Sequence, residues 1–397
     1  MITDKSNIKS FTFKGFQRKD GTKGIRNHII VMPASVCASP LAAKLSLASK
    51  RKVIALTHKE GCCQIGKDYE RTRQTLIGLA CNPNVAGVVL IALGCEGTPF
   101  MEIKSIIEET ARPVELVHIQ LEGGSKKALQ AGLKAIEKVY YAVRKTTKVV
   151  PSSIKDLVFG LECGGSDWTS GISSNPVIGC LTEHFINAGA KVILSETTEI
   201  IGAEHILASK IQDEEVKSKL LEIVNRLEDR AKKAGIDIRG AQPTPGNIEG
   251  GITTIEEKSL GMIYKAGNAT IQEVVEYAQK PTKNGLIFMD TPGQDVESMT
   301  GMAAGGAQIM IFSTGRGSPV GFPISPVIKI TGNPETFKKM KDDIDINAGR
   351  IINGNATISK IGLQALHLIE RVCNGDKTKA ELNDYSEIGI LKSEITL

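Results

Sequence analysis

Short apolar runs alternate with longer amphipathic segments along the first half of the chain. The short runs are rich in valine, isoleucine and leucine and predict buried strands, whereas the longer segments have helical periodicity. The predicted strands are 28–33, 53–57, 85–93 and 114–119, and the predicted helices are 35–49, 69–79, 101–111 and 124–144. Regular alternation of strands and helices is typical of a largely parallel sheet flanked by helices.

The second half repeats the pattern. Its predicted strands are 157–161, 191–194, 285–289 and 309–312, and its predicted helices are 177–188, 213–235 and 255–264. We therefore expect an α/β protein of two domains, each with a largely parallel sheet flanked by helices.

A domain boundary is predicted at 148–155, a segment that contains Pro151. The expected organisation is a leader at 1–14, an N-terminal α/β domain at 15–148 and a C-terminal α/β domain at 155–397. Within the second domain, prolines and glycines between 240 and 252 predict an irregular loop that serves as a lid or binding loop.

Several predicted strands end in cysteine, histidine or acidic residues. His58 and Cys62 follow one strand, Cys95 and Glu96 follow another, and Cys163 follows a third. Ligands bind at the carboxyl edge of open α/β sheets, so these residues are expected at ligand-binding edges. Thiolate, imidazole and carboxylate together are typical of metal-assisted chemistry.

Simpler interpretations stay open at this stage. Asp167 also fits a helix cap, His58 fits a structural hydrogen bond, and Arg18 and Arg26 fit solvated loop charges as well as a carboxylate clamp. A glycine- and serine-rich turn with Arg316 is either an anion site or an ordinary turn.

Composition narrows the class of protein. Hydrophobic residues make up 41% and charged residues 23% of 397 residues, as in soluble globular proteins. The net charge of +5 is not concentrated in a basic stripe, which argues against a nucleic-acid partner. The polar N-terminus and the lack of a long apolar run argue against export and membrane insertion, so a cytoplasmic protein is expected. Its eight cysteines are then expected to be reduced.

Seven ordered motifs carry a family resemblance: GFQRKDGTKGIRN, THKEGC, GCE, LECGGSD, SET with GAEH, FMDTPG and TGRGSP. By these motifs the chain resembles the altronate/galactarate dehydratase family of sugar-acid hydro-lyases, and the match runs from about Gly15 to about Asn355. The resemblance implies dehydration of a hexonate or hexarate to a 2-keto-3-deoxy acid, with a divalent metal that is usually iron. A related branch removes sulfite from sulfolactate, which leaves a sulfo-lyase as the alternative. A non-catalytic sugar-acid-binding subunit is a further alternative.

Site roles are assigned here from residue chemistry. The reaction requires loss of a proton from C2 and of hydroxide from C3, which calls for acid–base groups and a Lewis acid. Expected acid–base residues are Glu96, Asp167, Glu204 and His205; expected substrate-binding residues are Arg18, Arg26, Ser166 and Arg316; and expected metal ligands are His58, Cys62, Cys95, Cys163 and Glu196. The metal is expected to be Fe²⁺ or Mn²⁺, with an iron–sulfur cluster on the strand-end cysteines as the alternative.

The resemblance also implies a partner. Single-chain members of the family carry a small domain before the Gly15 motif, and here only fourteen residues precede that motif. A separate small subunit that binds near 18–27 is therefore expected, in addition to a homo-oligomer.

Overall fold

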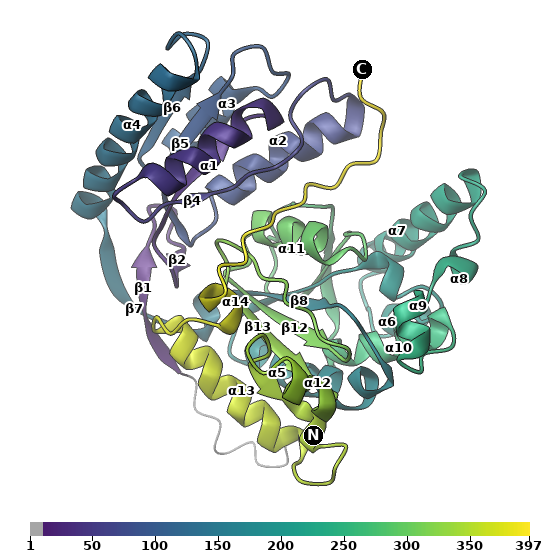
Figure 1. The fold of residues 1–397 in the computed structure, drawn as a ribbon. Helices are drawn as coiled ribbons and strands as arrows, with labels where there is room; N and C mark the ends of the chain where they lie inside the picture. The colour runs from purple at the N-terminus through teal and green to yellow at the C-terminus, as the bar shows by residue number, and fades with distance from the viewer. Residues whose placement is uncertain (1–10) are drawn as a thin grey trace.

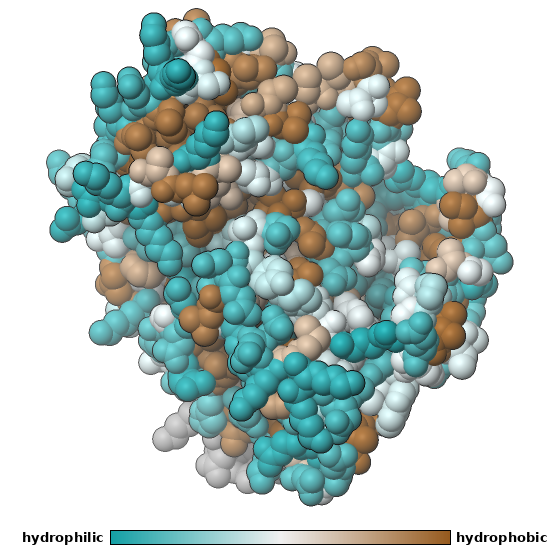
Figure 2. Space-filling model, in the orientation of Figure 1, coloured by the Kyte–Doolittle hydropathy of each residue, from teal (hydrophilic) through white to brown (hydrophobic). Residues whose placement is uncertain are grey.

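The computed structural model describes residues 11–397. Figure 1 shows the N-terminal half as the upper part of the molecule and the C-terminal half below it. The predicted fold class is confirmed, since parallel sheets flanked by helices form both halves. In the view of Figure 2, hydrophobic residues are most frequent over the upper half and hydrophilic residues over the lower end. Among the described residues, no helix has the length and apolar character needed to cross a bilayer.

A four-stranded parallel sheet in the order β4-β3-β5-β6 forms the N-terminal half. Its strands are β3 (His28–Pro33), β4 (Ile54–Ala55), β5 (Val85–Ala92) and β6 (Val114–His118), and its helices are α1 (Ser39–Ala48), α2 (Gly66–Ala80), α3 (Phe100–Glu109) and α4 (Ser125–Thr146). Every residue of β5 is buried, as expected of a central strand covered on both faces.

A seven-stranded parallel sheet in the order β10-β11-β9-β8-β12-β13-β14 forms the C-terminal half. Its strands are β8 (Val158–Cys163), β9 (Lys191–Leu194), β10 (Ile271–Val275), β11 (Gly285–Met289), β12 (Ile309–Thr314), β13 (Val327–Thr331) and β14 (Ile346–Asn347). The chain builds outward from β8 on one side and from β12 on the other. Strand order therefore reverses between β8 and β12, and in such sheets ligands bind beyond the carboxyl ends at this point.

Helices cover both faces of the large sheet. The longer ones are α5 (Asn175–Asn187), α7 (Glu214–Lys233), α10 (Ile255–Ile263), α11 (Asp295–Ala304) and α13 (Ile358–Cys373), and the shorter ones are α6 (Glu204–Ala208), α8 (Ile238–Ala241), α9 (Pro245–Glu249), α12 (Pro334–Lys339) and α14 (Lys379–Leu382). Helix α11 packs against α2 of the N-terminal half, so a single hydrophobic cluster spans both halves.

The segment predicted as a domain boundary contains a strand. Residues Lys148–Ser153 form β7, which pairs antiparallel with β1 (Thr12–Gln17) in a small sheet completed by β2 (Lys23–Gly24). Pro151 is tolerated because β7 lies at the edge of this sheet. The predicted leader is corrected in the same way, since Phe13 of β1 is buried in the core; residues 1–10 lie outside the described chain.

The predicted irregular loop at 240–252 also contains regular structure. Two short helices, α8 and α9, occupy this region, and α9 begins with a capping box formed by Thr244 and Asn247. Pro245 stands in the first turn of α9, where its missing N–H costs nothing. Local hydrogen bonding therefore orders a segment whose proline and glycine content predicted irregularity.

Candidate functional site

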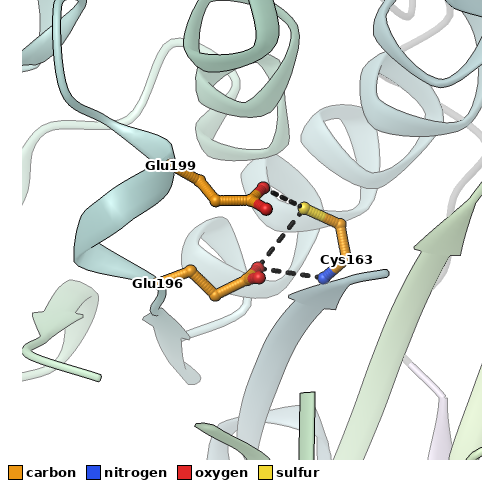
Figure 3. Close-up of side chains that lie close together, drawn as sticks. All are labelled: Cys163, Glu196 and Glu199. Carbon is orange, nitrogen blue, oxygen red and sulfur yellow. Dashed lines mark hydrogen bonds between the residues drawn. The ribbon is translucent and has the colours of Figure 1, made fainter. Parts of the chain in front are cut away.

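A fully buried group of polar side chains lies at the carboxyl end of β8. Cys163 ends β8, while Glu196 and Glu199 come from the turn that follows β9. Figure 3 shows the three side chains pointing toward one another. Glu196 has a left-handed backbone conformation with a φ of 70°, which residues other than glycine rarely adopt. Such backbone strain is common at functional sites.

Hydrogen bonds connect the thiol of Cys163 to both carboxylates. Its Sγ donates to Oε2 of Glu199 at 2.7 Å and lies 3.3 Å from Oε2 of Glu196. The backbone N–H of Cys163 also donates to Glu196, at 3.0 Å. The end of β8 and the turn after β9 are therefore joined through these three residues.

Two lysines from a neighbouring segment neutralise the carboxylates. Lys258 on α10 binds Oε1 of Glu199 at 2.9 Å. The ammonium of Lys265 lies 3.0 Å from Sγ of Cys163 and 3.1 Å from Oε2 of Glu196. Because the two lysines are seven residues apart, they lie two helical turns apart on one face of the continuous segment formed by α10 and the 3₁₀ turn after it.

The charge state of the group follows from this arrangement. Burial acts to raise the pKa of Glu199, but Lys258 and then Lys265 outweigh it and hold that pKa below its usual value. Burial, then Glu196 and Glu199, raises the pKa of the Cys163 thiol well above its usual value. Glu199 is therefore an ionised carboxylate and Cys163 a neutral thiol at pH 7.

A second set of acidic groups lies behind the first. Burial, followed by Glu196 and Asp295, raises the pKa of Glu162 well above its usual value. Glu162 accepts a hydrogen bond from Ser298 at 2.6 Å. Burial, then Glu196 and Glu199, raises the pKa of Asp295 to about 7. Glu162 therefore keeps its proton at a pH at which Glu199 is ionised, and Asp295 titrates near neutral pH.

A pocket opens onto one side of this group. Its volume is about 160 Å³, and its wall includes Cys163, Glu199 and Lys258. Ser166 and Asp167 also line it. The pocket is smaller than the ~300–1,000 Å³ typical of drug-sized ligands, which suits a small organic acid.

The same three residues have donor atoms that could face one metal ion. Ligand atoms of Cys163, Glu196 and Glu199 lie within 4.8 Å of one another, a spacing suitable for a metal ion. However, the fully buried Lys265 ammonium lies against both the sulfur and Glu196, in the position that a cation would take. A divalent ion there would lie beside a buried positive charge, where repulsion is weakly screened. This residue group therefore does not fit a metal ion.

The predicted metal ligands divide between the two halves of the molecule. Cys163 and Glu196 lie together as expected, whereas Cys62 and Cys95 belong to loops of the N-terminal sheet. His58 is buried, with Nε2 2.8 Å from the carbonyl oxygen of Pro33 and Nδ1 accepting the N–H of Glu60. The five predicted ligands therefore belong to strand ends of two different sheets.

Asp167 lines the pocket, but its carboxylate is already occupied. It accepts the N–H groups of Thr169 and Ser170, and Asn333 donates to its other oxygen at 3.0 Å. The simpler interpretation as a cap is thus the one the geometry favours. Ser166 lies in the pocket wall, and its carbonyl oxygen accepts a hydrogen bond from Asn247.

The other predicted acid–base residues lie outside the pocket. Glu96 accepts the N–H groups of Leu93 and Gly94 and so closes its own turn. Glu204 accepts the N–H of Gly202, and His205 is exposed on α6. Their positions fit local structure rather than proton transfer in this pocket.

The predicted substrate-binding arginines have structural partners. Arg18 is buried and donates to the carbonyl oxygen of Pro83 at 2.7 Å. Arg26 forms a bidentate pair with Glu381 at 2.9 Å for both bonds, which ties the first strands to the C-terminal segment. Arg316 is paired with Glu249 at 2.9 Å. Their donors are thus engaged by the protein itself.

Sequence reasoning missed Glu199, Lys258 and Lys265 as site residues. Glu199 stands three residues after Glu196 in the predicted strand end, so proximity to Glu196 was its available signal. Lys258 and Lys265 lie in a segment that reads as an ordinary amphipathic helix. Their only signal is burial, which is a tertiary property: Lys265 is fully buried and Lys258 is half-buried.

Comparison with known proteins identifies the family. The protein-family model described as D-galactarate dehydratase/altronate hydrolase, second domain, matches residues 15–144. The model described as D-galactarate/altronate dehydratase, C-terminal, matches residues 154–396.

Three relatives span most of the chain. Altronate dehydratase of Bacillus subtilis is 33% identical over 97% of this chain and 78% of its own length. Galactarate dehydratase (L-threo-forming) of Escherichia coli is 33% identical over 93% of this chain and 74% of its own length. The (2R)-sulfolactate sulfo-lyase subunit beta of Chromohalobacter salexigens is 36% identical over 96% of this chain and 97% of its own length. The chain therefore belongs to the D-galactarate/altronate dehydratase family of lyases.

Proposed function

We propose that this protein is a hydro-lyase that removes water from a hexonate or hexarate such as altronate or galactarate and forms a 2-keto-3-deoxy acid. The observation that carries the proposal is the buried Cys163–Glu199–Lys258 group in the wall of a small pocket, in a chain whose relatives include altronate and galactarate dehydratases. An ionised carboxylate paired with an ammonium is a suitable acid–base couple.

Glu199 is the proposed general base. Its carboxylate is ionised, and it lines the pocket where the C2 hydrogen of a bound acid would lie. That hydrogen is very weakly acidic because it stands beside an ionised carboxylate. Lys258, and behind it Lys265, stabilise the negative charge that develops on the substrate carboxylate as the proton leaves.

Lys258 is the proposed general acid. The C2–H bond breaks as Glu199 takes the proton, the C2–C3 double bond forms, and the C3–O bond breaks as Lys258 gives a proton to the departing hydroxide. Glu199 then returns its proton to Lys258 across their 2.9 Å contact. Water is released, the enol product becomes the 2-keto-3-deoxy acid, and both groups regain their starting charges.

Replacement of the base tests this assignment. Glu199→Gln removes the proton acceptor and should lower kcat by about 10²–10⁴-fold while KM changes much less. Glu204→Gln is the matched control, because Glu204 only closes a turn at the start of α6 and should retain wild-type kcat. Equal kcat for Glu199→Gln and wild type would refute Glu199 as the base.

A sulfo-lyase is the second candidate. The sulfolactate sulfo-lyase subunit aligns over 97% of its own length and has the highest identity of the three relatives described above. Sulfite leaves without being protonated, so this reaction needs the base but not the acid. The test is a panel of altronate, galactarate and sulfolactate assayed for 2-keto-3-deoxy acid and for sulfite. Sulfite release from sulfolactate with no keto-deoxy acid would replace the first proposal, and binding without turnover would indicate a non-catalytic subunit.

We also propose that the enzyme depends on iron, as Fe²⁺ or as an iron–sulfur cluster, with Mn²⁺ as a substitute for Fe²⁺. When bound, the iron would polarise the oxygen atoms of the hydroxy acid. The lysine-neutralised group at Cys163 argues against that position for the ion, so we propose that its ligands are among the remaining cysteines. Activity should disappear with a strong chelator and return with iron; full activity in demetallated protein would refute the dependence.

A second polypeptide is proposed as a partner. The sulfo-lyase relative is itself named as a subunit, and the pocket rim here carries four exposed hydrophobic side chains: Trp168, Ile172, Leu260 and Tyr264. A partner over this rim, rather than near 18–27 as expected from the sequence, would exclude water from the pocket and raise kcat. Co-expression with a small family subunit tests this. Equal turnover with and without it, and no co-purification, would show that the chain acts alone.

A further inference from the structure

Four cysteines gather at the carboxyl edge of the N-terminal sheet. Cys37 follows β3, Cys62 and Cys63 follow β4, and Cys95 follows β5. Because the strand order is β4-β3-β5, these loops leave three adjacent strands that are ~4.8 Å apart. The fold thus brings together thiols that are up to 58 residues apart in sequence (95 − 37).

The three loops are hydrogen-bonded to one another. Val36 donates its N–H to the carbonyl oxygen of Glu60 at 2.8 Å. Thr98 donates through its hydroxyl to the carbonyl oxygen of Gly61 at 3.0 Å. Gly61 has a φ of 97°, and a Cβ there would lie 2.3 Å from the carbonyl oxygen of Ala34. The loops therefore meet so closely that only glycine fits between them.

The thiols lie within electrostatic reach of one another. Their loops leave adjacent strands and are joined by the hydrogen bonds described above. Sγ of Cys62 lies 3.7 Å from Sγ of Cys63. Cys37, Cys63 and Cys95 are exposed, so nothing in the described chain buries them.

The local electrostatics favour an anionic group. Helices α1, α2 and α3 all begin just after these loops, at Ser39, Gly66 and Phe100. Each N-terminus directs the positive end of a helix dipole toward the edge that carries the cysteines. Thiolates and thiolate-bound clusters are stabilised in such a position.

The distances between the cysteine sulfur atoms distinguish a site for an iron–sulfur cluster from a site for a single metal ion. A zinc or iron ion bound by thiolates has metal–sulfur distances of ~2.3 Å, which requires the sulfurs to be close together. Among residues 11–397, a set of three potential ligand atoms within 4.8 Å of one another occurs at Cys163, Glu196 and Glu199 and not at these cysteines. Several irons bridged by sulfide span a wider gap than one ion does.

We propose that Cys37, Cys62 and Cys95 bind a [4Fe–4S] cluster at the carboxyl edge of the N-terminal sheet. One thiolate comes from the loop after each of three adjacent strands, and Cys63 is not a ligand because its neighbour Cys62 already supplies the thiolate of that loop. Three protein thiolates leave one iron of a four-iron cluster free to take an oxygen ligand from water or a hydroxy acid. The proposal rests on the cysteine geometry and does not depend on the acid–base roles of Glu199 and Lys258.

The test is anaerobic reconstitution of the full chain with ferrous iron and sulfide. The expected result is about four irons and four acid-labile sulfides per chain, with the broad visible absorbance of a cluster. Cys37→Ser, Cys62→Ser and Cys95→Ser should each lose most of the iron and sulfide. Cys63→Ser and Cys81→Ser are the matched controls and should retain both.

Mass spectrometry after alkylation keeps the test independent of variant folding. In reconstituted wild-type protein, the cluster should protect Cys37, Cys62 and Cys95 from iodoacetamide, while Cys63 is modified. Zinc or iron bound without sulfide, equal loss of cluster in Cys63→Ser, or unprotected Cys37 and Cys95 would each overturn the proposal. Because these measurements need no substrate, a negative activity assay and a missing cluster are separate outcomes.

Discussion

The carboxyl edges of the two parallel sheets contain chemically reactive residues in opposite environments. At the large sheet, Cys163 is buried and its acidic neighbours are neutralised by two lysines. At the small sheet, Cys37 and Cys95 are exposed, and no bonded lysine accompanies them in the described chain. The same topology thus produces one self-neutralised group suited to proton transfer and one group of thiols suited to an iron–sulfur cluster. A cysteine at a strand end does not by itself define the chemistry.

Thiol reactivity should separate the two edges most strongly. In metal-free protein, Cys37, Cys63 and Cys95 should react with iodoacetamide orders of magnitude faster than Cys163, because they are exposed while Cys163 is buried with its pKa raised by burial and by Glu196 and Glu199. Time-resolved labelling followed by peptide mass spectrometry measures each rate. Cys163 labelling as fast as Cys95 would show that the large-sheet group is open to solvent.

The second-largest effect is expected on stability, when a buried positive charge is removed from the edge of the large sheet. Lys265→Met leaves Glu196 without its cation and should lower the free energy of unfolding by about 3–5 kcal/mol, as expected when one partner of a buried pair is deleted. Urea unfolding measures the change. Lys232→Met on the exposed face of α7 is the control and should change stability by less than about 0.5 kcal/mol. A similarly small effect at Lys265 would contradict a neutralising role.

The pH dependence of stability offers a smaller test. The pKa of Asp295 is raised to about 7 in the folded protein, so between pH 4 and 7 the folded state binds more protons than the unfolded state. This group therefore stabilises the fold less as pH rises, by on the order of 3 kcal/mol over that interval. Asp295→Asn should flatten this decline and raise stability at pH 7. Identical pH profiles for the variant and wild type would exclude Asp295 as its source.

The predicted strands and helices of the alternating pattern were largely correct, because burial on both faces of a parallel sheet imposes continuous apolar runs. Strands 28–33, 191–194 and 285–289 match β3, β9 and β11. Some of the missed elements have clear apolar patterns, such as β13 and α13, whereas others have weak local signals. Strand β7 contains proline, and β14 has two residues, so both depend on pairing with distant strands.

The sequence alone determined the family, the parallel α/β architecture and the positions of Cys163 and Glu196 at strand ends. These features depend on local periodicity and on ordered motifs. Tertiary structure decided which strand ends meet. It placed Lys258 and Lys265 beside the carboxylates, paired Arg26 with Glu381, and put Cys62 and Cys95 on a different sheet from Cys163. The physical reason is that burial and charge neutralisation are properties of packed side chains, and the same lysine is solvated on one helix face and a site residue on another.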